Sequence, residues 1–171
     1  DLVRAGVIYS AMGIAGIIGR ILWAVVADRW VAPRIVLGSL GLIMGAASIA
    51  SAMITASWPM SAMVAVGIVF GATAIGWNGI FFAEVARYSP PGEIGAATAG
   101  AQVFTYSGAT IAPPIFAAIV SLTGHYAAGF YVLAVFPILI GLRVLLSRAP
   151  GVDPSPSADG PKTNTASDGK P

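Results

Sequence analysis

The sequence predicts an all-α fold, a polytopic membrane bundle of five transmembrane helices, because few residues are charged and the apolar stretches are long. Only 9% of the 171 residues are charged, whereas 57% are hydrophobic and the mean hydropathy is +0.84. A soluble domain of ordinary composition has about a quarter of its residues charged, so we expect most of the surface of this chain to face lipid. An open-ended segment in lipid must satisfy its own backbone hydrogen bonds, which only a helix does.

Five apolar stretches are long enough to cross a membrane, since about 20 helical residues span a hydrocarbon core of about 30 Å. The connections between them are short, which makes neighbouring helices antiparallel. Together they form one expected membrane domain, residues 1–148. The expected spans are residues 7–27, 35–56, 60–82, 94–122 and 127–146.

The first span carries an arginine into the membrane, and the second span begins directly after a tight turn. Gly6, Gly13 and Arg20 recur seven residues apart and so share one helix face. Small residues let helices approach closely, so we expect this face to pack inside the bundle. There Arg20 would pair with a carboxylate, Asp28 or Glu84. Alternatively, its side chain extends to the membrane interface about two turns away.

The third span has two faces of different character. Thr73 and Trp77 project from one face, where they suit the wall of a cavity for a small organic solute or, equally, fill space between helices. Glycines and Asn78 project from the other face. We expect Asn78 to form a hydrogen bond between helices there.

The fourth span carries the clearest polar stripe, and such a stripe faces protein or water rather than lipid. We choose Gln102 and Tyr106, one turn apart, for solute contact; hydrogen bonding between helices is the alternative. Pro113-Pro114 removes two backbone donors and is expected to kink the helix. The stripe spans an arc of about 140° and consists of Thr98, Gln102, Thr105, Tyr106 and Thr110.

Arginines predict the orientation, because positive residues collect on the cytoplasmic side. Most of them fall on one side of the five-span path, whereas Arg4 falls on the other. The carboxyl terminus is therefore expected in the cytoplasm, and the polar residues 149–171 are expected to form a disordered cytoplasmic tail. The chain begins without an initiator methionine, and we interpret it as a piece of a longer chain. The cytoplasmic arginines are Arg29, Arg34, Arg87, Arg143 and Arg148.

The residue types that catalysis and metal binding need are scarce. There is no cysteine and one histidine, His125, which is expected in an external loop. Asp28, Glu84 and Glu93 are spread over two loops, so they predict no metal site. No nucleophile–base pair or phosphate-binding glycine loop is present. We therefore expect no enzyme, catalytic residue, metal or cofactor, and the isolated arginines predict no nucleic-acid partner.

The segment GRILWAVVADRW, followed by Pro33-Arg34, resembles the loop signature of the major facilitator superfamily. That signature reads Gly-x-x-x-Asp-Arg/Lys-x-Gly-x-Arg/Lys-Arg/Lys, and Asp28, Arg29 and Arg34 match it. Ala24, Val31 and Pro33 depart from it, as positions in the second, weaker family copy often do. Glu84-Val85-Ala86-Arg87 resembles the acidic–basic pair after the tenth family helix. GEIGAATAG and Ala112-Pro113-Pro114 resemble the eleventh helix.

The resemblance implies that the five spans correspond to family helices eight to twelve of a secondary active transporter. Two helical bundles of such proteins rock about a solute site near the membrane midplane. The expected partners are the lipid bilayer, a small-molecule solute and an amino-terminal half that is missing here. The expected location is the bacterial inner (plasma) membrane.

A cluster of charges is expected at the cytoplasmic face, where it would hold the first and third spans together in one access state. Its alternative is a set of independent loop charges that only determine topology. Two alternatives to transport stay open for the chain. It could be a non-transporting membrane scaffold or receptor subunit, or an inactive truncated transporter fragment. The cluster consists of Arg20, Asp28, Arg29, Glu84 and Arg87.

Overall fold

The computed structural model describes residues 2–147, which form helices joined by short connections. The expected tail, residues 149–171, and Arg148 lie outside the described residues. The six helices are α1 (Leu2–Arg29), α2 (Pro33–Ala52), α3 (Met60–Ala74), α4 (Trp77–Tyr88), α5 (Ile94–Thr123) and α6 (Tyr126–Leu146).

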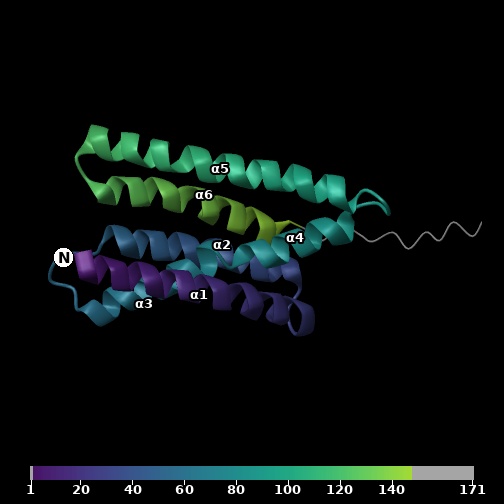
Figure 1. Cartoon of the computed structure of the whole chain (residues 1–171), viewed down its shortest axis with the longest axis horizontal. Coiled ribbons are helices and arrows are strands. Elements are labelled where there is room, and N and C mark those ends of the chain that lie inside the picture. The colour runs from purple at the N-terminus through teal and green to yellow at the C-terminus, as the bar shows by residue number, and fades with distance from the viewer. Residues whose placement is uncertain (1, 148–171) are drawn as a thin grey trace, which may run out of the picture.

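These helices form an elongated bundle of five spans, since α3 and α4 together make one crossing (Figure 1). Each of the five is long and apolar enough to cross a membrane. The predicted all-α class with five transmembrane helices is confirmed. The first span is longer than expected and begins at Leu2. Helix α5 runs through Pro113 and Pro114 without ending, and α6 likewise contains Pro137.

The third span is not one continuous helix, because Ile75 and Gly76 separate α3 from α4. Such a break leaves backbone carbonyls of α3 without intrahelical partners, which is unfavourable in lipid. Two indoles satisfy two of them. Trp23 of α1 donates its Nε1–H to the Ala72 carbonyl at 2.8 Å, and Trp77 donates to the Ala74 carbonyl at 3.0 Å.

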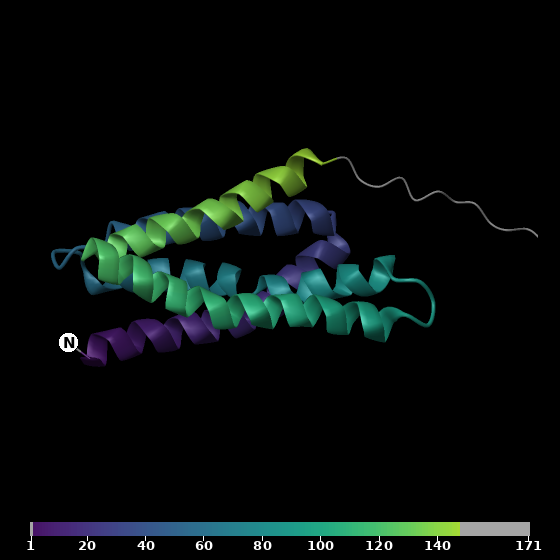
Figure 2. The same ribbon diagram turned by 90° about the horizontal axis from the view of Figure 1, so that it is seen from above.

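Close helix contacts divide the bundle into two pairs, α2 with α6 and α1 with α3. Helix α6 lies along α2 in both views (Figures 1 and 2). A Cβ added at Gly41 of α2 would lie 3.0 Å from the Gly141 Cα of α6. A Cβ at Gly71 of α3 would overlap the carbonyl oxygen of Met12 in α1. Glycine is therefore required where these backbones meet, as expected for helices packing in lipid.

The face of α1 that packs in the bundle is not the one expected from its small residues. Its buried residues are Ala15, Gly16 and Gly19, and Gly19 lies against α3. A Cβ at Gly6 or at Gly13 would meet nothing within 4 Å. Within residues 2–147 the predicted packing role was wrong for Gly6 and Gly13, whereas Arg20 does pack against Gly79 of α4. Close approach of α3 determines which glycines are buried, and helical spacing alone does not reveal that approach.

Candidate functional site

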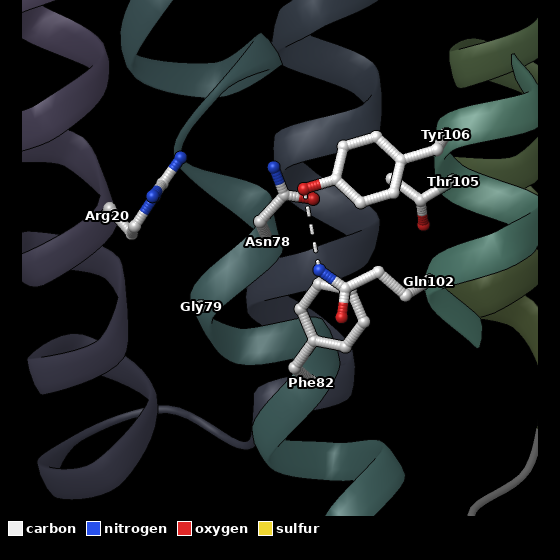
Figure 3. Close-up of a pocket in the computed structure, with 7 residues that line it drawn as sticks. All are labelled: Arg20, Asn78, Gly79, Phe82, Gln102, Thr105 and Tyr106. Carbon is white, nitrogen blue, oxygen red and sulfur yellow. Dashed lines mark hydrogen bonds between the residues drawn. The ribbon is translucent and has the colours of Figure 1, made fainter. Parts of the chain in front are cut away.

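Polar side chains from α1, α4 and α5 surround a cavity of about 310 Å³, which we call the polar cavity (Figure 3). It lies beside the break in the third span, since Asn78 and Gly79 belong to the first turn of α4. The size is at the lower end of the range for small-molecule sites. The lining residues are Arg20, Asn78, Gly79, Phe82, Gln102, Thr105 and Tyr106.

Arg20 enters the polar cavity because its neighbour on α1 is held tightly against α3. A Cβ at Gly19 would lie 3.0 Å from the Ala72 Cα, so the two backbones touch there. Gly79 of α4 leaves room for the stem of Arg20, since a Cβ at Gly79 would lie 3.3 Å from the Arg20 Cγ. Figure 3 shows the guanidinium group extending from α1 towards α4. At Arg20 the expected face of α1 thus borders both α4 and the cavity.

Helix α5 supplies the opposite wall. Gln102 donates its Nε2–H to the Tyr106 hydroxyl at 3.5 Å, a long and therefore weak hydrogen bond. Thr105 donates to the Ala101 carbonyl of its own helix at 3.0 Å. No residue of α5 is buried, so Gln102 and Tyr106 are held by the helix and by each other, without dense packing around them.

Asn78 has a buried side-chain oxygen without a hydrogen-bond partner among the described residues. In Figure 3 its amide lies between Arg20 and the side chains of α5. The hydrogen bond between helices that was expected for Asn78 is thus absent for this oxygen in the described part of the chain. An unsatisfied buried acceptor costs about 1–3 kcal/mol, so its presence at a cavity suggests a site that a ligand completes.

Thr73 and Trp77 lie elsewhere, on a second cavity of about 310 Å³ that is lined by α2, α3, α4 and α6. Its other walls are apolar, and we call it the apolar cavity. Thr73 donates to the Val69 and Phe70 carbonyls at 2.8 and 3.1 Å, and Trp77 already donates to its own chain. The structure therefore brings Gln102 and Tyr106 together but separates them from Thr73 and Trp77.

Charged side chains at the end of the bundle that carries most arginines form one ion pair within residues 2–147. Arg87 Nε lies 3.4 Å from Glu84 Oε1, one turn apart on α4, and the Glu84 side chain is 17% exposed. Asp28 and Arg29 are exposed at the end of α1. Arg34 in the first turn of α2 has a buried Nη1 without a partner in the same described range.

Sequence reasoning missed the association of Arg20 and Asn78 with the α5 stripe. The two residues lie on α1 and α4, which α2, α3 and the break at Ile75–Gly76 separate along the sequence. A sequence signal existed for each alone, as a polar group within a span. No sequence pattern indicated that α1, α4 and α5 bring these polar side chains together at the same level along the bundle.

Comparison with known proteins gives a family but no individual relative. The family model described as Major Facilitator Superfamily matches residues 4–168, almost the whole chain. No curated protein and no solved structure matches it. The matched stretch includes every described helix apart from the first residues of α1. The chain belongs to the Major Facilitator Superfamily, and it is an integral membrane protein of a family of membrane transporters.

Proposed function

We propose that the chain is the carboxyl-terminal portion of a secondary active transporter of a small solute, and that the polar cavity is its part of the solute site. The observation that carries this proposal is the meeting of Arg20, Asn78 and Gln102 within membrane-spanning helices. An ionisable residue inside a span is costly and usually marks a pathway for substrates or ions. Family membership makes a transported solute the natural ligand.

The surroundings of the polar cavity support alternating access with a second bundle. Tyr106, Ser107 and Thr110 line a further groove on the outer face of α5. Tyr106 is 63% exposed. Apolar side chains, among them Val103 and Ile111, make up most of the remaining groove wall. The polar groups at its edge do not suit lipid, whereas a facing amino-terminal half would cover the groove and close the site. We place the protein in the bacterial inner membrane with its carboxyl terminus in the cytoplasm.

A reconstitution experiment separates transport from the rival functions. The chain, an amino-terminal half and both together are inserted into liposomes, and uptake of radiolabelled lactate, phosphate, glucose and choline is measured. We expect uptake of at least one solute with both parts and none with the chain alone. Absence of uptake in every preparation would favour the non-transporting scaffold. Uptake by the chain alone would show that the second half is not required.

We also propose that Asp28, Arg29, Glu84 and Arg87 form a network that steadies one access state. The Glu84–Arg87 pair supports it. Arg20, which the sequence predicts in this network, lines the polar cavity instead. Exposed ion pairs contribute about 0–1 kcal/mol, so Asp28→Asn and Glu84→Gln should each lower uptake by up to about fivefold. Initial uptake rates in liposomes measure this loss. Unchanged rates in both variants would contradict the proposed network.

A further inference from the structure

The polar cavity has the electrostatic character of an anion site, and we propose that its solute is a small organic anion whose carboxylate binds Arg20. This rests on the proposed function, because it names the class of solute that the same site transports. Three features of the structure carry it: an arginine without a counter-charge, a helix amino terminus, and neutral side chains placed to orient a ligand.

Arg20 makes no hydrogen bond or ion pair within residues 2–147. No acidic side chain of the described residues lines the polar cavity. Asp28 is eight residues further along α1, about 12 Å at the helical rise, and Glu84 is paired with Arg87 at 3.4 Å. A guanidinium group keeps its charge at any physiological pH. Arg20 is also exposed in the described structure, so a solute can reach it and supply the counter-charge that residues 2–147 lack.

The break in the third span adds positive potential at the same place. Helix α4 begins at Trp77, so Asn78 and Gly79 lie in its first turn, and no side chain caps that end. A helix amino terminus carries about half a positive charge, and broken helices of transporters direct such ends at anionic groups. The carbonyls of Ala72 and Ala74, which would oppose this potential, accept hydrogen bonds from indoles.

Neutral groups around Arg20 can orient the rest of the solute. Asn78 offers a buried oxygen that lacks a donor, which a hydroxyl group of the solute would supply. Gln102 and Tyr106 are joined only by a long hydrogen bond of 3.5 Å, so both can turn to a ligand. The guanidinium group can hold a carboxylate with two parallel hydrogen bonds.

The single cationic side chain favours a carboxylate over a phosphate. Among the residues that line the polar cavity, Arg20 is the only one with a charge. A phosphate dianion would leave one negative charge uncompensated inside the membrane, where uncompensated charge is costly. One carboxylate neutralises the site.

Uptake by the complete transporter, this chain together with the proposed amino-terminal half and seventh family helix, tests the proposal. Liposomes are offered lactate, benzoate, inorganic phosphate, glucose or choline in separate assays. We expect saturable uptake of a carboxylate. Arg20→Gln should lower it at least about tenfold, since a hydrogen bond to a charged group contributes about 1.5–3 kcal/mol. Arg20→Lys keeps the charge but not the paired hydrogen bonds, so it should raise KM more than it lowers the maximal rate.

The matched control is Arg143→Gln on α6, an exposed arginine in the last turn that lines neither cavity. It should leave carboxylate uptake unchanged. Wild-type uptake of only glucose, choline or phosphate would overturn the carboxylate proposal while leaving a transporter in place. Full carboxylate uptake by Arg20→Gln would also overturn it. Failure of wild type to take up any of the five solutes would count against the proposed function itself, and against this inference with it.

Discussion

Replacing Asn78 with leucine is expected to lower solute uptake by about tenfold to a hundredfold without destabilising the protein. The buried Asn78 oxygen has no partner in the described part of the chain, so the folded protein gains nothing from it. Removing an unpaired buried acceptor is neutral or stabilising. A solute bound at the polar cavity would instead lose a hydrogen bond, and about 1.4 kcal/mol corresponds to a factor of ten.

Two measurements on Asn78→Leu are needed, because the two effects have different expected signs. Initial uptake rates in liposomes give the functional loss, and unfolding in mixed detergent micelles gives the stability. The free energy of unfolding of Asn78→Leu should be the same as that of wild type or higher by up to about 1 kcal/mol. Ser61→Ala, at an exposed position of α3, is the control and should change neither quantity. If Asn78→Leu takes up the solute at the wild-type rate, Asn78 is not part of the solute site.

Gly71→Leu is expected to separate α1 from α3 and to destabilise the bundle by about 3 kcal/mol. A Cβ at this position would overlap the Met12 carbonyl, and a backbone group cannot move aside as a flexible side chain can. Because Gly19 and Ala72 meet along the same contact, the displacement should also shift Arg20. Uptake should therefore fall together with stability.

The same substitution at Gly13 is the matched control for Gly71→Leu. A Cβ at Gly13 would meet nothing within 4 Å, and both positions lie on membrane-spanning helices. Detergent-induced unfolding, followed by tryptophan fluorescence, compares the two variants. Equal stability of Gly71→Leu and Gly13→Leu would contradict the proposed α1–α3 packing.

The fold class was predictable because it depends on composition. A chain with 9% charged residues and long apolar stretches has few folds other than a helical membrane bundle. The division of the third span was not predictable, since Ile75-Gly76 differs little in composition from the apolar sequence around it. Trp23, far away in the sequence, helps to make the break acceptable by its hydrogen bond to Ala72.

The candidate site was predictable one helix at a time. The polar stripe of α5 identified Gln102 and Tyr106, which do line a polar cavity; solute contact there stays a prediction. Helical periodicity indicates which residues share a face, but not which face meets which neighbour. For that reason the sequence did not reveal that Thr73 and Trp77 line a different cavity from Gln102 and Tyr106, and the partners of Arg20 were sought at the membrane interface.

Thiol labelling tests most directly whether the polar cavity, rather than the apolar cavity, receives the solute. The chain has no cysteine, so Thr105→Cys and Thr73→Cys each introduce a single reactive group once any cysteine of the proposed amino-terminal half is replaced. In the complete transporter, a water-soluble reagent that cannot cross membranes should label the Thr105→Cys variant, and the transported solute should slow that reaction. The Thr73→Cys variant should not react. Labelling and solute protection at position 73, with no reaction at position 105, would contradict the account.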